Sequence, residues 1–256
     1  MTKLTGAKNS GRKYSGAELG TGSRELETTG VGRLYRKLLS EFGPQGWWPT
    51  IQSPVSSLRS PVLGKPHTAP GSQLIYHPGD YSFPKTEQQR FGIVAGALLT
   101  QNTSWKNAEK ALLNLHSAGK LSPGKIISLP LPELETLIRP SGYFRQKAER
   151  LKSLSEAYLE ADGDADTETL REHFLSVGGV GPETADSILL YAYKRPVFVV
   201  DAYTRRICSS LRLFHGKGYE DYRLFFESSL PRKHEIFNEF HALIVEWGKR
   251  NPDKRI

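Results

Sequence analysis

The stretch VGGVGPETADSILLYAYKRPVFVVDAYTRRI (residues 177–207) joins a glycine-rich turn to a carboxylate in apolar surroundings, Asp201, twenty positions beyond the last glycine. Gly178, Gly179 and Gly181 precede a proline, an order typical of a tight turn that leads into a helix N-terminus. The free N–H groups of such a turn, aligned with the dipole of the next helix, suit a phosphate oxygen. The alternative interpretation is an ordinary turn between two antiparallel helices.

The charge balance of the whole chain favours a polyanionic partner. Lys and Arg outnumber Asp and Glu by 35 to 27 in 256 residues, which gives a net charge of +8. Such a balance is typical of proteins that bind nucleic acid or an anionic membrane surface. No apolar run approaches the roughly 18 residues of a membrane span, and the N-terminal residues lack the apolar core of a secretory signal. We therefore expect no membrane partner.

The cysteine and histidine content predicts no metal site. The single cysteine, Cys208, excludes a disulfide framework and a cysteine-held zinc or iron–sulfur site, and it indicates a reducing cell interior. We expect it to be a thiol in a helical core. None of the histidines has a spacing typical of a metal site, and His215, His234 and His241 are interpreted as surface or packing residues. The predicted localisation is cytoplasmic, in association with the nucleoid.

Helical periodicity from Lys85 onward predicts an all-α fold. The one β-like run, Pro196–Val200, has no partner run nearby. Residues 1–30 are polar and glycine-rich and are predicted to be a disordered basic tail, whereas the proline-rich residues 44–85 are interpreted as functional or disordered. Helices are predicted over 31–43, 86–101 with Thr86 as its cap, 104–119, 122–128, 131–138, 143–160, 167–176, 182–194, 201–213, 219–229 and 232–249.

The glycine turn and the Asp201 segment together resemble the helix–hairpin–helix and catalytic-aspartate region of the endonuclease III superfamily of DNA glycosylases. The resemblance extends through GALLTQNTSW (96–105), RPSGYFRQKA (139–148) and FNEFHALIVEWGK (237–249), and thus covers residues 31–250. Together with the adjacent tryptophans of GPQGWWPT, these segments make the sequence most similar to the bacterial 3-methyladenine glycosylase branch of the superfamily. That branch can carry a lysine directly after the aspartate, where this sequence has Ala202.

The resemblance implies a two-lobed helical fold with the active site in the cleft between the lobes. Residues 31–84 would join 201–256 in one lobe, and residues 85–200 would form a six-helix barrel that contains the hairpin. Many superfamily members hold an iron–sulfur cluster with four C-terminal cysteines. The residues after Lys249 read RNPDKRI, so we expect no such cluster and no other cofactor. The expected partner is double-stranded DNA with a damaged base, bound by a monomer.

The resemblance also assigns the chemistry. It makes Asp201 the essential carboxylate, which would stabilise positive charge on the deoxyribose and orient water. Without the resemblance, Asp201 would be interpreted as a helix N-cap only. Bifunctional relatives carry a nucleophilic lysine at the second position after the last hairpin glycine, and this sequence has Glu183 there. The sequence therefore predicts a monofunctional enzyme. Glu183 and Asp186 are interpreted as solvated or capping carboxylates.

The remaining candidate residues would hold DNA and the everted base. Hairpin contacts to the DNA backbone are expected from Gly178, Gly179, Val180, Gly181 and Thr184, and phosphate-neutralising cations are Lys147, Arg145 and Arg205. The base pocket and the wedge that fills the vacated stack are assigned to Trp47, Trp48, Gln101 and Asn102. The alternatives are solvated cations, helix capping by Gln101 and Asn102, and core packing by the tryptophans.

Three functions remain open from the sequence. Aromatic walls would select a cationic alkylated purine such as 3-methyladenine over a normal base. The same scaffold could instead act on a mismatched or oxidised base, such as thymine or uracil opposite guanine. A non-catalytic DNA-binding module would use the hairpin for grip alone.

Overall fold

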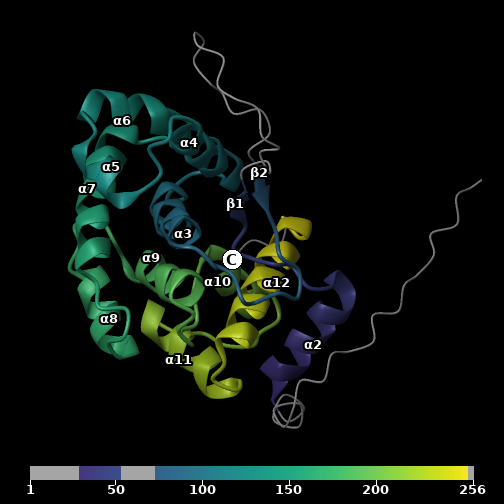
Figure 1. The fold of residues 1–256 in the computed structure, drawn as a ribbon. Helices are drawn as coiled ribbons and strands as arrows, with labels where there is room; N and C mark the ends of the chain where they lie inside the picture. The colour runs from purple at the N-terminus through teal and green to yellow at the C-terminus, as the bar shows by residue number, and fades with distance from the viewer. Residues whose placement is uncertain (1–28, 53–72, 253–256) are drawn as a thin grey trace, which may run out of the picture.

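The computed structural model describes residues 29–52 and 73–252, and helices dominate this part of the chain (Figure 1). The predicted all-α class is confirmed. The predicted disordered tail falls almost wholly outside the described residues, as do residues 53–72 of the proline-rich segment.

The described elements follow the predicted helices closely, with two short strands added. The strands β1 (Thr50–Gln52) and β2 (Gln73–Ile75) pair antiparallel, with Thr50 opposite Ile75. The helices are α2 (Gly30–Phe42), α3 (Glu87–Leu99), α4 (Trp105–Ser117), α5 (Pro123–Ser128), α6 (Leu131–Ile138), η1 (Arg139–Ser141), α7 (Phe144–Glu160), α8 (Thr167–Leu175), α9 (Pro182–Ser187), η2 (Ile188–Ala192), α10 (Ala202–Ser210), α11 (Tyr219–Ser229) and α12 (His234–Arg250).

Side-chain caps fix where several helices begin. Thr86 accepts a hydrogen bond from the backbone N–H of Gln89, whose own side chain accepts from the Thr86 N–H, so the predicted cap of α3 is a complete capping box. Thr29 caps α2 in the same way through the N–H of Gly32. At the other end of α2, Gly43 has a φ of 70° and a ψ of 176°, a positive-φ conformation that glycine adopts without a Cβ clash, and its N–H donates to the carbonyl of Leu39.

The β-like run Pro196–Val200 forms an extended, unpaired connector. Side chains of α11 satisfy its backbone, since Phe198 N–H donates to Glu227 Oε1 at 2.9 Å and Val200 N–H to the Tyr219 hydroxyl at 3.3 Å. From Val197 onward the run is buried, so these bonds replace those that a neighbouring strand would supply. The connector leads directly to the N-terminus of α10.

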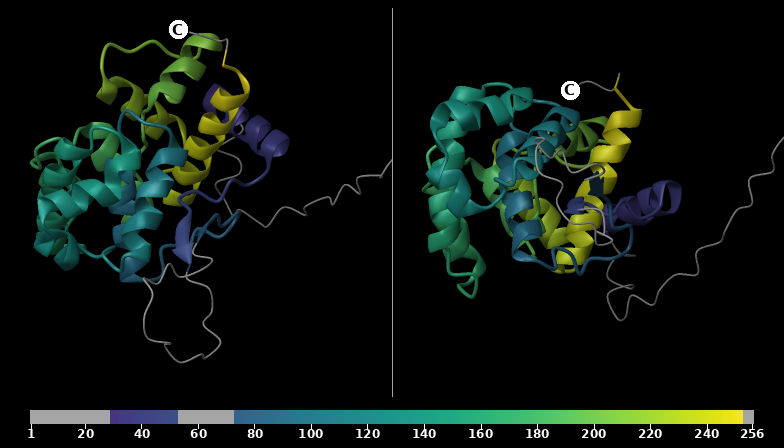
Figure 2. Two further views of the ribbon diagram at one scale, coloured as in Figure 1. Left: turned by 90° about the horizontal axis from the view of Figure 1, so that it is seen from above. Right: turned by 45° about the horizontal axis from the view of Figure 1, so that its top comes forward.

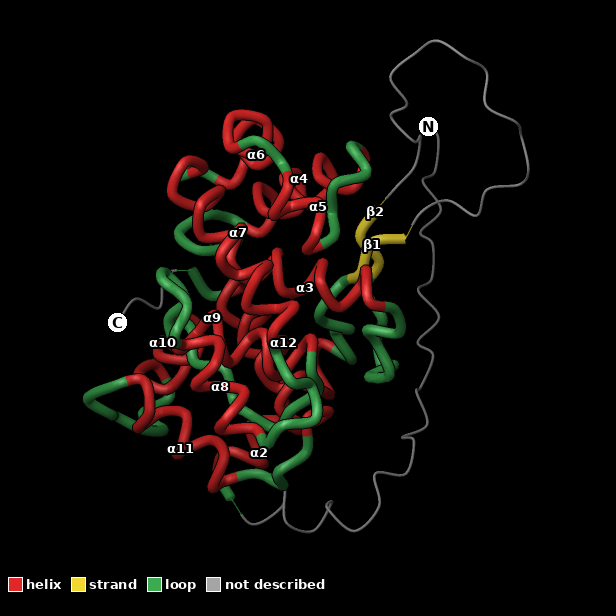
Figure 3. Tube along the Cα trace, turned by 60° about the vertical axis from the view of Figure 1, so that its left-hand side comes forward, coloured by secondary structure: helices red, strands yellow, loops and turns green. Residues whose placement is uncertain are grey.

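The long helices surround a shared core in which α3, α9 and α12 lie centrally. Helices α4 to α7 gather at one end, and α2, α8 and α11 lie at the other (Figures 1 and 3). Helix α12 packs against both α2 and α10, whereas α3 packs against α4, α7 and η2. Figure 2 shows α2 beside α12 in both of its views. The proposed division into two lobes stays a prediction.

The core is mostly apolar, although charged side chains such as Lys147, Asp186 and Glu239 are also buried. Fully buried side chains include Phe91, Phe198 and Phe237, and Cys208 is buried with them as predicted. Across the two described ranges, no helix has both the length and the apolar character needed to cross a bilayer.

Candidate active site

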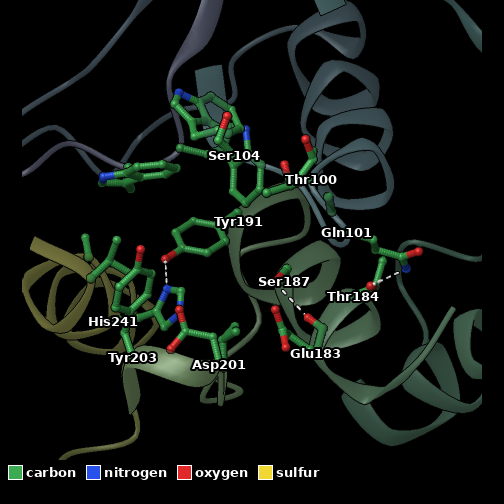
Figure 4. Close-up of a pocket in the computed structure, with 18 of the residues that line it drawn as sticks. Thr100, Gln101, Ser104, Glu183, Thr184, Ser187, Tyr191, Asp201, Tyr203 and His241 are labelled. Carbon is green, nitrogen blue, oxygen red and sulfur yellow. Dashed lines mark hydrogen bonds and ion pairs between the residues drawn. The ribbon is translucent and has the colours of Figure 1, made fainter. Parts of the chain in front are cut away.

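A cavity of about 420 Å³ lies where α3, α4, α9, η2 and α12 meet (Figure 4). This volume is within the range of roughly 300–1,000 Å³ typical of ligand pockets. Predicted residues from distant parts of the chain meet here. The lining includes Trp47, Trp48, Gln101, Trp105, Lys106, Glu183, Thr184, Tyr191, Asp201, Tyr203, His241 and Lys249.

Asp201 is both the N-cap of α10 and a wall of the cavity. Its Oδ1 accepts hydrogen bonds from the backbone N–H of Thr204 at 2.7 Å and from the Thr204 hydroxyl at 2.9 Å. Its Oδ2 lies 3.5 Å from His241 Nε2. Burial opposes the charge of Asp201, but His241 and then Thr204 outweigh it and lower the pKa of this carboxyl below its usual value. The carboxylate is therefore ionised and fixed.

Glu183 brings a second carboxylate to the cavity from α9 (Figure 4). Loss of solvation raises the pKa of Glu183, and the negative charge of Asp201 raises it further, against the opposing effects of His241 and Arg205. Glu183 is an exposed residue, in keeping with its interpretation as a solvated carboxylate, and it also lines the cavity. The two carboxylates of one cavity have opposite pKa shifts, a pattern that occurs at catalytic sites.

Aromatic rings form the opposite wall. Trp47 and Trp48 meet Trp105 edge to face, with ring centroids 5.1 and 5.2 Å away, and Trp48 also meets Tyr191 at 5.3 Å. Gly96 of α3 makes room for this packing, because a Cβ there would come within 3.2 Å of the Trp48 ring. Trp48 therefore serves the core and the cavity together. Trp105 was not predicted as a site residue, although it is the last residue of the quoted segment GALLTQNTSW.

The glycine hairpin lies beside the cavity. The N–H of Val180 donates to the carbonyl of Val177 at 3.0 Å and so closes the turn. Within the described residues, the N–H groups of Gly178, Gly179 and Gly181 donate to no protein acceptor. These three glycines are exposed, whereas Val180 is buried. Free amides on exposed glycines are what an anion nest requires.

Gln101 ties the α3–α4 turn to this hairpin. Its side-chain amide donates to the carbonyl of Gly179 at 3.0 Å and to the hydroxyl of Thr184 at 2.8 Å. Thr184 is buried, so its side chain faces the protein interior and the cavity. Asn102 is exposed at the tip of the same turn with a φ of 52°, a left-handed conformation that asparagine tolerates better than most residues.

Comparisons with known proteins give the family. The model of the HhH-GPD superfamily, described as base excision DNA repair proteins, matches residues 95–232, more than half of the chain. The chain belongs to the HhH-GPD superfamily. The match spans the hairpin and the Asp201 segment.

Similar proteins agree with this assignment to DNA glycosylases of base excision repair. A provisionally assigned DNA repair glycosylase of Methanocaldococcus jannaschii is 39% identical over 227 residues, which cover 85% of this chain and 86% of that protein. Endonuclease III of Thermotoga maritima is 29% identical, covering 66% and 78%. A crystal structure of H. pylori 3-methyladenine DNA glycosylase bound to 1,N6-ethenoadenine matches with a TM-score of 0.57 and 30% identity, covering 67% of this chain and 89% of that one.

The prediction that Lys147 contacts a DNA phosphate is wrong. Lys147 is 2% exposed, and its ammonium donates to the carbonyl of Leu99 at 2.8 Å and to that of Ser141 at 2.7 Å. Its positive charge therefore holds the end of α3 and the turn before α7 together. The other two cations stay accessible: Arg145 is exposed, and Arg205 is partly exposed above the Tyr222 ring.

Asp186 and His241 also differ from their sequence interpretation. Asp186 is fully buried and accepts two hydrogen bonds from Arg171, at 2.6 and 3.3 Å, so it is neither solvated nor a cap. His241 packs in the interior as one interpretation held, but it also faces Asp201. In the sequence, His241 lies on an apolar helix face, so nothing in the pattern distinguished it from an ordinary core residue. In the described ranges, no three His, Cys, Asp or Glu side chains are grouped to hold a metal ion.

Proposed function

We propose that this HhH-GPD glycosylase is monofunctional and hydrolyses the N-glycosidic bond of an everted alkylated purine, with 3-methyladenine-like bases as its substrate class. The observation that carries the proposal is an ionised Asp201 that accepts two hydrogen bonds from Thr204 and lines a cavity with tryptophan walls. Glu183 stands in that cavity where bifunctional relatives have their lysine.

Asp201 supplies the electrostatic part of the reaction. Breaking the bond between C1′ and the base nitrogen builds positive charge on the sugar, as in glycoside hydrolysis. An ionised carboxylate facing that charge stabilises the transition state more than the ground state. Thr204 holds one carboxylate oxygen in place, so no rearrangement is needed as the charge develops.

Base eversion brings the sugar to this carboxylate. Unstacking a nucleotide costs a few kcal/mol, and damaged bases cost the least. The free amides of Gly178, Gly179 and Gly181 would bind a backbone phosphate beside the cavity, with Arg145 and Arg205 adding attraction that falls with salt. Asn102, exposed at its turn, would fill the vacated stack.

The aromatic wall favours a cationic base. Indole faces attract cations by about 0.5–2 kcal/mol, depending on how much solvent is excluded. A 3-alkylated adenine carries a positive charge that normal adenine lacks, and the same charge makes it a good leaving group. The 30% identity to an H. pylori 3-methyladenine DNA glycosylase supports this substrate class.

Hydrolysis rather than amine attack follows from the position of Glu183. A Schiff base requires an unprotonated amine at C1′. The lysines that line the cavity are Lys106 and Lys249, and Lys249 lies with its ammonium 5.5 Å from the centre of the Trp47 ring. Neither occupies the hairpin position, so water is the nucleophile in this proposal.

The test is a substrate panel with release of free base as the readout. Duplexes with 3-methyladenine, 7-methylguanine, uracil opposite guanine, thymine opposite guanine or 8-oxoguanine are incubated with the protein, with and without borohydride. We expect release of alkylated purines, intact strands and no covalent complex. Release confined to the mismatches or to 8-oxoguanine would overturn the substrate class, and a trapped complex would overturn the monofunctional assignment.

A further inference from the structure

We propose that His241 is a positioning residue for Asp201, and that Tyr191 sets the imidazole tautomer that points an N–H at the open oxygen of the carboxylate. The inference rests on the proposed function, because it assigns a neighbour to the carboxylate proposed there. It adds a chain of contacts that runs from η2 through α12 to the N-cap of α10 (Figure 4).

The contacts of His241 are unequal. Its Nδ1 lies 2.6 Å from the Tyr191 hydroxyl, a short hydrogen bond between two buried groups. Its Nε2 lies 3.5 Å from Asp201 Oδ2 and, among the described residues, forms no hydrogen bond of normal geometry. A buried ring nitrogen without a full partner is costly, so this nitrogen requires the nearby carboxylate or a bound group.

The Tyr191 hydroxyl decides where the imidazole proton lies. Burial raises the pKa of Tyr191 well above its ordinary value, and the negative charges of Asp201 and Glu239 act in the same direction. The phenol therefore keeps its proton. The ionised Asp201 near Nε2 favours the tautomer with an Nε2–H, which leaves His241 Nδ1 to accept a hydrogen bond from the phenol O–H. A neutral imidazole whose Nδ1 accepts must carry its proton on Nε2. That proton points toward Asp201 Oδ2.

The two oxygens of Asp201 consequently have separate supports. Oδ1 is held by the N–H and hydroxyl of Thr204, which belong to the same helix turn. Oδ2 has the His241 Nε2–H as its neighbour from another helix. Catalytic hydrogen bonds are often long in the free enzyme and shorten in the substrate complex. Closing the 3.5 Å gap would hold Oδ2 beneath the sugar.

The fold places Tyr191 for this contact by an irregular turn. Residues Ile188–Ala192 form the π-helical turn η2 instead of continuing α9 as an α-helix. Such turns rotate the following side chains and often occur at functional sites. Here the turn brings the Tyr191 hydroxyl to α12, and the Tyr191 ring also packs against Trp48.

The first readout is single-turnover base release from an alkylated duplex, measured together with the melting temperature. His241→Leu removes the N–H and should slow release by roughly tenfold, the effect of a lost hydrogen bond to a charged group. His241→Gln keeps an N–H near the Nε2 position and should recover most of the rate. Tyr191→Phe leaves both tautomers of His241 accessible, so it should slow base release less than His241→Leu does.

The second readout separates a charge effect from a structural one. One duplex carries a pyrrolidine abasic analogue, whose ring nitrogen is cationic, and its match carries the neutral tetrahydrofuran analogue. The cation imitates the charge of the transition state. His241→Leu should weaken binding to the pyrrolidine duplex by about tenfold and to the tetrahydrofuran duplex by no more than about twofold. In an Asp201→Asn background, the same substitution should change neither affinity.

Failure of this inference is distinguishable from failure of the proposed function. Undiminished base release by Asp201→Asn would overturn the proposed function and the inference with it. Suppose that Asp201→Asn abolishes base release. Positioning by His241 alone is then overturned if His241→Leu has no effect, if it weakens binding to the two duplexes equally, or if it still weakens binding in the Asp201→Asn background. Absence of recovery in His241→Gln with an unchanged melting temperature would also overturn it.

Discussion

Asp201 and Glu183 illustrate how neighbours decide the charge of a carboxylate. Both line the same cavity, where partial loss of solvent favours the protonated form of each carboxyl group. The pKa of Asp201 is nevertheless lowered, because His241 and Thr204 are partners that stabilise its charged form. Glu183 faces the negative charge of Asp201 instead, so its proton is held more tightly. At residue scale, the site thus contains one fixed anion and one carboxyl group of weakened acidity.

Because of its position in the hairpin, substitution of Glu183 by lysine should add the ability to form a Schiff base with abasic DNA. Glu183→Lys places an amine at the hairpin position that bifunctional relatives use, and a nearby Asp201 can accept its proton. We expect this variant to form a borohydride-trapped complex with abasic DNA, which wild type and Glu183→Gln do not form. A trapped complex of equal yield in all three proteins would mean that another amine, such as Lys249, reaches C1′.

At the scale of elements, the hairpin depends on one glycine more than on its neighbours. Gly179 has a φ of +86°, and a Cβ there would collide with the side chain of Arg150 on α7. Gly178 lacks both constraints, since its φ is ordinary and nothing lies within 4 Å of an added Cβ. The two positions therefore form a matched pair.

Gly179→Ala should weaken binding to lesion and undamaged duplexes alike, by roughly tenfold, because backbone contacts carry no sequence information. The left-handed φ alone costs an alanine about 1–2 kcal/mol of stability. Gly178→Ala should leave both affinities near wild type. Fluorescence anisotropy across a salt series checks both variants, and equal losses at the two positions would contradict this account of the turn.

Lys147 connects the end of α3 to the turn before α7. Its substitution by methionine leaves the carbonyls of Leu99 and Ser141 without their donor, at a cost of about 2–3 kcal/mol in unfolding free energy. Burial lowers the pKa of Lys147 from 10.5 to about 8, with a contribution from Arg150.

This pKa predicts how the cost changes with pH. Between about 8 and 10.5 the unfolded chain holds the Lys147 proton more tightly than the folded one, so the contribution of Lys147 to stability rises with pH through this window. Urea unfolding at pH 7 and pH 10 should therefore show a larger difference between wild type and Lys147→Met at pH 10. A difference that shrinks would contradict the burial of this ammonium.

At the scale of the whole molecule, an ion-pair network joins α8, α9 and α11 behind the hairpin. Arg171 contacts the fully buried Asp186 at 2.6 Å and the half-exposed Glu220 at 2.6 Å. Arg171→Met removes the cation paired with the buried Asp186 and should cost about 3–5 kcal/mol in unfolding free energy. Glu220→Gln, at the solvent side, should cost less than about 1 kcal/mol. Denaturant titrations of both variants measure this, and similar costs would contradict the ranking by burial.

Local signals in the sequence predicted most of the fold. Periodicity and caps located the helices, including the box at Thr86. The three-residue strands β1 and β2 were missed because such short runs carry no alternating pattern. The buried connector Pro196–Val200 resembled a strand because burial selects the same apolar residues, whereas its hydrogen bonds to side chains of α11 depend on tertiary structure.

The site was predicted where motifs were local and missed where it depends on packing. The hairpin, Asp201, Glu183 and the two adjacent tryptophans come from contiguous motifs. Trp105, Tyr191 and His241 lie on helix faces whose apolar neighbours conceal their contact with the cavity. Lys147 was wrongly predicted to contact DNA, because the sequence does not show that its ammonium donates to two carbonyls inside the protein.

Asp201→Asn, in single-turnover assays on a 3-methyladenine duplex, shows whether the charge of Asp201 drives base release. Asparagine is also a good N-cap, so α10 should keep its start and the variant its fold. We predict that base release slows by about 10²–10³ or more, while affinity for the lesion duplex stays within about threefold of wild type. Release at the wild-type rate would show that the negative charge of Asp201 is not needed for catalysis.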